Sequence, residues 1–193
     1  MKLINALLLI CLFNGLIAQE IFQVNAKKSQ VLWHAEKVTG THDGTIDIKS
    51  GVIHITEGKF SGGAFVLDMT SIKVTDMDDP KYNEKLGRHL MSPDFFSAAV
   101  HETSKFEIDR VVHQGKDRYK VEGNMTIKGI TNRNKFIANI KVSKDKIEAF
   151  ADIVIDRAEY DVRYGSGSFI EDLGDKTIYD EFSLKVTLLA DKK

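Results

Sequence analysis

Six histidines are the residues best suited to metal binding or acid–base catalysis, and they are scattered over 193 residues. They are His34, His42, His54, His89, His101 and His113. No two stand four positions apart, the spacing that would place two ligands on one helix face. The pattern therefore predicts no metal centre and no cofactor. It leaves open a histidine-dependent enzyme that would use, as base or ligand, His34, His42, His89 or His101.

Nucleophilic chemistry has equally little support. The sequence holds one cysteine, Cys11, which falls in an apolar leading segment. No Gly-x-Ser-x-Gly turn and no ordered Ser, His and Asp set accompanies it. We therefore expect no disulfide, no thiol nucleophile and no serine triad in the remaining chain.

Three arginines are suited to binding an anionic group, because a guanidinium pairs well with phosphate or carboxylate. They are Arg88, Arg157 and Arg163. Arg157 follows Asp156 directly, so a structural ion pair is an alternative for it. For Arg88 and Arg163 the alternative is a solvated surface charge.

The first eighteen residues have the pattern of a secretory signal peptide. Lys2 supplies a positive start, Leu3 to Ile17 is mostly apolar, and Ala18 offers a small residue for cleavage. The run is short for a membrane span, and no second apolar run follows. We expect residues 19–193 to form one domain of a periplasmic or secreted protein.

Charge is nearly balanced, with 27 Lys and Arg against 28 Asp and Glu. The sequence has no basic stripe of the kind that indicates nucleic-acid binding. A secreted chain of this length without disulfides must be held together by its core.

Alternation of polar and apolar residues dominates the rest of the sequence and predicts strands. The expected strands lie near 29–38, 44–56, 63–74, 104–113, 119–128, 135–142, 146–155 and 178–188. Eight to ten strands of such length, joined by short turns, either form a sandwich or close. Because closure removes exposed edges, we predict an all-β fold, an elongated closed antiparallel barrel of about eight strands.

Two segments break the alternation. Asp79 and Pro80 start a predicted helix near 80–91, in which Tyr82, Leu86 and Leu90 form an apolar stripe. Such a helix cannot lie in a barrel wall, so we expect it to cover an end of the barrel. Behind Ser92-Pro93, the adjacent Phe95 and Phe96 suit a plug at that end or ordinary core packing. A second irregular stretch, 157–176, has no strand period after Val162 and carries Tyr164 and Phe169.

Three motifs together resemble the YceI-like family. They are "HLMSPDFFSAAVHETSKFEI" (89–108), "GNMTIKGITNRNKF" (123–136) and "IDRAEYDV" (155–162). Their order and spacing match the family pattern over about residues 22–190. The resemblance implies a lipocalin-like barrel that binds a polyisoprenoid or similar amphiphilic lipid in its lumen without catalysis. The family often forms dimers, so a homodimer is an open alternative to a monomer.

If the barrel binds a lipid, some side chains would contact the ligand in the lumen and others would bind its polar head group. Small inward residues would leave room for a ligand: Ala35, Gly123, Ala138, Ala149 and Ala151. Large ones would contact it: Trp33, Phe95, Phe96, Phe106, Ile108, Met125, Ile127, Phe136, Tyr164, Phe169 and Phe182. The head-group candidates are Arg88, Arg157, Arg163, His34 and His42, and the two histidines are alternative equivalents of a family histidine.

An eight-stranded barrel is also narrow enough to be filled by its own side chains. A second hypothesis is therefore an envelope or stress-related interaction protein with a filled core and no lipid ligand. A continuous apolar cavity would argue against it.

Overall fold

The computed structural model of the protein describes residues 19–193, and the predicted signal peptide lies outside that range. Within it the chain forms one helix, two short 3-10 turns and nine strands. The strands are β1 (Gln19–Val24), β2 (Gln30–Lys37), β3 (Gly40–Thr56), β4 (Lys59–Val74), β5 (Thr103–His113), β6 (Arg118–Ile127), β7 (Ile130–Val142), β8 (Lys146–Asp156) and β9 (Ile178–Lys192). The helix is α1 (Pro80–Met91), and the 3-10 turns are η1 (Arg157–Tyr160) and η2 (Gly174–Lys176).

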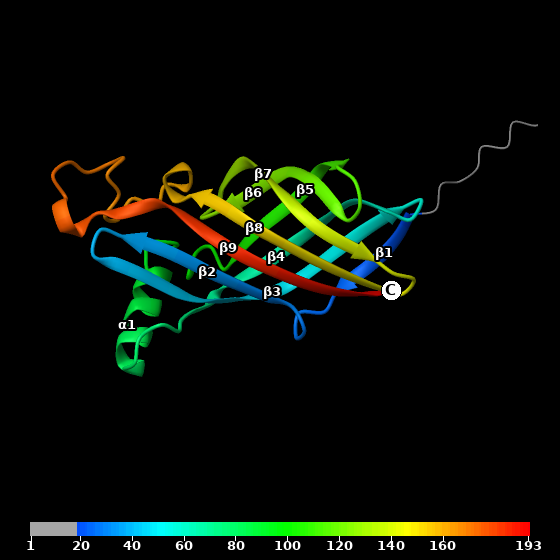
Figure 1. The fold of residues 1–193 in the computed structure, drawn as a ribbon. Helices are drawn as coiled ribbons and strands as arrows, with labels where there is room; N and C mark the ends of the chain where they lie inside the picture. Colours follow the sequence, from blue (N-terminus) through cyan, green and yellow to red (C-terminus); the bar gives the residue numbers. More distant parts are fainter. Residues whose placement is uncertain (1–18) are drawn as a thin grey trace, which may run out of the picture.

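All neighbouring strands run antiparallel and close into the predicted barrel (Figure 1). From β2 the wall runs through β9, β8, β7, β6, β5 and β4, and it closes where β4 pairs with β3. The short strand β1 pairs with the second half of β3 and the end of β9, whereas β2 pairs with the first half of each. Together β1 and β2 therefore occupy the position of one strand of the barrel, interrupted between Val24 and Gln30.

Two details of the wall differ from the sequence prediction. No strand was predicted at β1, where Phe22 and Val24 are the buried residues. The predicted start of β7 was five residues too late. Lys128 and Gly129 have φ values of 50° and 77°, the conformation of a type I′ turn, so β7 already starts at Ile130.

Helix α1 begins and ends at the residues that the capping pattern predicted. The Asp79 side chain accepts a hydrogen bond from the Lys81 amide at 2.9 Å, and Pro80 is the first helical residue. The helix packs on β4, with Gly87 as its buried residue. Leu86 and Leu90 pack against the core, but Tyr82 is 60% exposed, so the stripe is buried only in the later turns.

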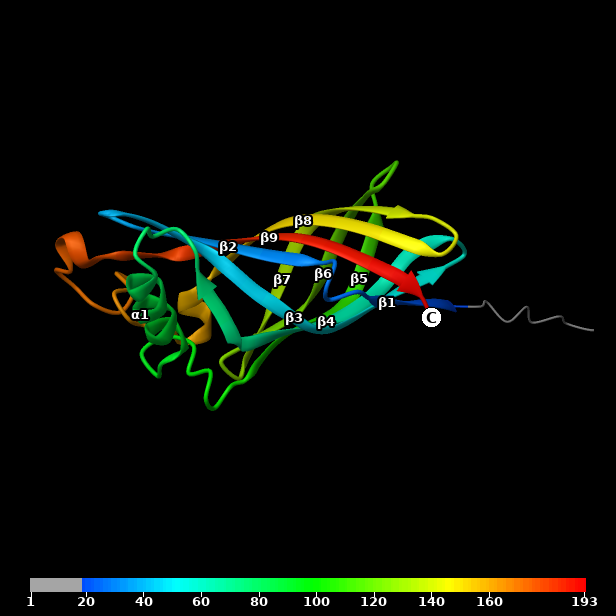
Figure 2. The ribbon, with the colours of Figure 1, turned by 90° about the horizontal axis from the view of Figure 1, so that it is seen from below.

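The two ends of the barrel differ (Figures 1 and 2). One end carries α1, the β2–β3 hairpin and the loop that includes η2, while the start of β1 and the C-terminus lie at the other. The chain thus places its irregular segments together at the helix end.

No helix within residues 19–193 is long and apolar enough to cross a membrane.

Candidate functional site

Two apolar chambers lie inside the barrel. The mouth chamber, next to α1, has a volume of about 130 Å³ and is lined by residues that include Trp33, Leu86, Leu90, Phe95, Phe96 and Phe182. The inner chamber has a volume of about 100 Å³ and is lined by residues that include Ile53, Phe60, Phe106, Ile108, Phe136 and Ile140. The barrel is therefore not filled by its own side chains.

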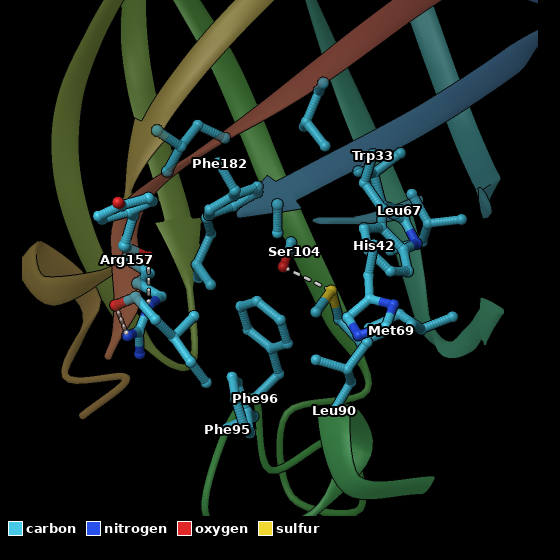
Figure 3. A pocket seen from close by; sticks show the side chains of 18 of the residues that line it. Trp33, His42, Leu67, Met69, Leu90, Phe95, Phe96, Ser104, Arg157 and Phe182 are labelled. Carbon is cyan, nitrogen blue, oxygen red and sulfur yellow. Dashed lines mark hydrogen bonds between the residues drawn. The ribbon is translucent and has the colours of Figure 1, made fainter. Parts of the chain in front are cut away.

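The chambers adjoin one another. Four residues line both of them: Leu67, Ser104, Met125 and Leu184. Ser104 is buried, and its hydroxyl donates to the thioether sulfur of Met69 at 2.8 Å (Figure 3). Because a thioether is a weak acceptor, this junction remains almost entirely apolar.

Phe95 and Phe96 sit at the floor of the mouth chamber in Figure 3. The segment after Ser92-Pro93 folds back on α1, because the Phe96 amide donates to the Leu90 carbonyl and the Ala98 amide to that of Met91, at 3.1 and 2.8 Å. Phe95 is buried, with 5% exposure, whereas Phe96 is half-buried and lies 6.2 Å from the Phe182 ring. The two rings thus line the helix end of the lumen.

Arg157 is buried beside Phe95 and binds four backbone carbonyls. Its guanidinium donates to Val162, Tyr164, Ile178 and Tyr179, at distances from 2.7 to 3.2 Å. Those carbonyls belong to the two ends of the loop that follows η1, so one side chain ties the loop closed. The guanidinium carbon also lies 5.9 Å from the centre of the Phe95 ring.

Burial lowers the pKa of Arg157, and the nearby Asp180 and Asp156 carboxylates oppose that shift. Nη2 of Arg157 lies 3.2 Å from Oδ1 of Asp180, without the geometry of a hydrogen bond, so their attraction is Coulombic. An arginine stays protonated under physiological conditions. The partner of Arg157 is Asp180 in the main, rather than the adjacent Asp156 that the sequence suggested, since Asp156 caps η1 through the Ala158 amide.

Most of the other predicted lumen residues line one or both chambers. Trp33, Met125, Ile127 and Phe182 line the mouth chamber, and Phe106, Ile108, Met125 and Phe136 line the inner one. Tyr164 and Phe169 line neither chamber. Tyr164 packs on His89 and Phe95 with ring centres 4.6 and 5.3 Å apart, and Phe169, 43% exposed, lies under the Arg163 guanidinium.

Of the head-group candidates, the structure brings Arg157 and His42 to the mouth chamber. His42 pairs with Asp76 at 2.9 Å, which ties β3 to the segment leading into α1. His34 faces outward and bonds Asp43 and Glu36 at 2.8 and 3.2 Å, and these bonds raise its pKa. Arg88 pairs with Glu84 on the exposed side of α1, and Arg163 pairs with Asp161.

Four of the five small residues line the chambers. Ala35 lines the mouth chamber, and Ala138, Ala149 and Ala151 line the inner one. Gly123 has a different role. A Cβ there would come within 2.3 Å of the Glu107 carbonyl oxygen, so Gly123 allows β5 and β6 to approach at a bulge.

Several lining residues were missed in the sequence. Leu67 and Met69 of β4 and Leu184 of β9 fall on the inward parity of their strands, and this alternation is the signal that could have identified them. Among residues 19–193, no group of three or more His, Cys, Asp or Glu side chains is arranged to hold a metal ion.

Comparisons with known proteins agree with this architecture. A family model described as "YceI-like domain" matches residues 22–190. A UPF0312 protein of Azotobacter vinelandii is 31% identical over 84 residues, which are 42% of this chain and 43% of that protein. The chain thus matches less than half the length of this curated relative.

Solved structures show the same fold at low identity. Burkholderia cenocepacia BcnA superposes with a TM-score of 0.67 at 20% identity, covering 86% of this chain and 98% of that one. A polyisoprenoid binding domain from Saccharophagus degradans, implicated in plant cell wall breakdown, gives 0.66 at 13%, covering 89% and 98%. A Campylobacter jejuni YCEI protein gives 0.56 at 19%, covering 70% and 75%.

Proposed function

Because the chain belongs to the YceI-like family, we propose that its barrel binds a long apolar ligand, a polyisoprenoid or similar amphiphilic lipid, without catalysis. The observation that carries this proposal is the pair of adjoining apolar chambers inside the barrel. The Saccharophagus degradans neighbour, described as polyisoprenoid binding, supports the same ligand class.

Apolar burial alone is a sufficient source of affinity for such a ligand. Each methylene moved from water into the lumen contributes about 0.8 kcal/mol. A chain of many carbons therefore offers more than binding requires, and the cost of ordering it reduces the gain. No hydrogen bond to the tail is needed, so lumen length and width would set selectivity.

Removal of residues 1–18 would release the protein into the periplasm or the medium, where it would store or carry the ligand. The two chambers argue against the alternative of a filled core. The enzyme alternative has less support. His34 lies outside the chambers in its own ion pairs, and His42 is paired with Asp76.

Native mass spectrometry tests the proposal. Protein purified gently from its native host should show an adduct that denaturation and solvent extraction remove, and the extract should contain an apolar lipid. A single mass equal to that of the bare chain, under conditions that preserve a reference lipid carrier, would contradict lipid binding.

A further inference from the structure

The barrel wall is paired unevenly between β7 and β8. Their ladder runs from Val142 and Ile147 to Ala138 and Ala151, where it stops. Both strands continue beyond this point, since β7 stays paired with β6 as far as Ile130 and β8 stays paired with β9 as far as Asp156. The two strands therefore diverge and leave a seam, which consists of residues 130–137 of β7 and 152–156 of β8. Figure 2 shows this divergence.

One side chain spans the seam in place of the backbone ladder, and two more bind the η1 turn and the residue after it. Asn134 Nδ2 donates to the Val154 carbonyl at 3.5 Å, and Asn132 Nδ2 donates to the Glu159 carbonyl at 2.8 Å. Just before β7, Lys128 Nζ donates to the Asp161 carbonyl at 2.7 Å. Oδ1 of Asn134 is buried without a hydrogen-bond partner in the described chain. These few side-chain hydrogen bonds are thus easier to separate than a continuous ladder would be.

The seam lies directly over the lumen. Phe136 of β7 and Ile153 of β8 line the inner chamber, as do Ala138 and Ala151 at the point of divergence. Ile155 lines the mouth chamber. On the outside of β8, Val154 in the seam is 57% exposed, whereas Phe150, 42% exposed, lies opposite Asn139 where the strands are still paired. The seam thus presents Val154 beside exposed charged residues such as Arg133 and Lys135 on its outer face, and apolar side chains on its inner face.

At the helix end, the segments around the mouth chamber are held in place by side-chain contacts. Phe95 is buried there, Arg157 holds the adjoining loop by four hydrogen bonds, and α1 packs on β4. We propose that the seam between β7 and β8 is the lateral portal through which the apolar ligand enters and leaves the lumen. This inference rests on the proposed lipid binding and adds the route.

Reversible cross-linking tests the portal. In a Cys11→Ser background, the pair Lys135→Cys/Val154→Cys places thiols on the two lips, and a two-carbon bis-methanethiosulfonate reagent joins them. Loading of cis-parinaric acid, an 18-carbon polyene fatty acid, is followed by energy transfer from Trp33, the single tryptophan of the sequence. We expect the bridged protein to load at least about tenfold more slowly, and reductant to restore the rate.

Two matched pairs serve as controls. Lys141→Cys/Glu148→Cys joins the same strands where they are already paired, and its bridge should leave the loading rate unchanged. His42→Cys/Asp76→Cys bridges the helix end. Slower loading with that bridge, and an unchanged rate with the seam bridged, would overturn the portal and assign entry to the mouth.

Weakening the seam gives an independent readout. The Asn132→Ala/Asn134→Ala variant should load about five- to tenfold faster, as expected for the loss of two modest hydrogen bonds. Asn139→Ala, on the exposed and paired part of β7, should not change the rate. Unchanged rates in the double variant would contradict the portal, whereas failure of the unmodified protein to bind the probe at any concentration would count against lipid binding itself.

Discussion

Nη1 of Arg157 lies 2.7 Å from the carbonyl oxygen of Val162, inside the ring of four backbone acceptors that this guanidinium satisfies. Arg157 was a head-group candidate in the sequence. Its hydrogen bonds show that a bound anion would have to compete with the loop that Arg157 holds together.

Replacing Arg157 with alanine should lower the free energy of unfolding by about 3–5 kcal/mol, because it leaves Asp180 and several buried carbonyls without their partner. Lysine should not restore the loss, since one ammonium cannot match the planar guanidinium. Denaturant unfolding measures the effect. Arg163→Ala, on the exposed surface, should stay within about 0.5 kcal/mol of the parent. Equal losses for the two alanine variants would contradict the assignment.

The adjacent Phe95 and Phe96 should respond differently to truncation. Phe95→Ala should cost about 3–5 kcal/mol of stability, because the ring is almost fully buried. Phe96→Ala should cost less, since Phe96 is half-buried. Thermal unfolding compares them, and similar losses would show that both rings are core residues.

Narrowing the lumen should displace the ligand. Ala149→Leu projects into the inner chamber and should reduce the co-purified lipid, while the delipidated protein gains about 0.5–2 kcal/mol from the filled cavity. Native mass spectrometry gives the ligand fraction. Glu148→Leu adds the same side chain to the outer face of β8 and should leave that fraction unchanged.

Gly44 should tolerate no side chain. A Cβ there would lie 1.9 Å from the Lys73 carbonyl oxygen and 2.5 Å from the Trp33 ring. Gly44→Ala should therefore cost about 1–3 kcal/mol and shift the emission of Trp33. Gly167→Ala, with no atom within 4 Å of the added carbon, is the matched control and should change neither quantity.

The ion pairs of His34 should make stability depend on pH. Hydrogen bonds to Asp43, and then to Glu36, raise the pKa of His34 above its ordinary value of 6.5. A raised folded-state pKa means that the contribution is complete below about pH 6.5 and is lost as the pH rises through the folded-state value. His34→Gln should thus lower the melting temperature more at pH 5.5 than at pH 8.5. An NMR titration that placed the His34 pKa below 6.5 would contradict this.

Much of the fold was predictable because its causes are local. Period-two alternation identified β2 to β6, β8 and β9, and Asp79-Pro80 identified the start of α1. β1 was missed because six residues with two buried positions give too weak a pattern. The early start of β7 was missed because Asn132 and Asn134 occupy inward positions where the alternation predicts apolar residues.

The sequence by itself determined that the chain makes long strands, that a capped helix interrupts them, and that alanines and aromatics share their inward faces. Alternation and capping act between residues close in the chain, so one sequence displays them. Only the tertiary structure decided that the lumen stays open, that Arg157 binds the loop after η1, and that the wall has a seam at β7 and β8. These features depend on how far apart distant strands lie, and barrel closure sets those distances.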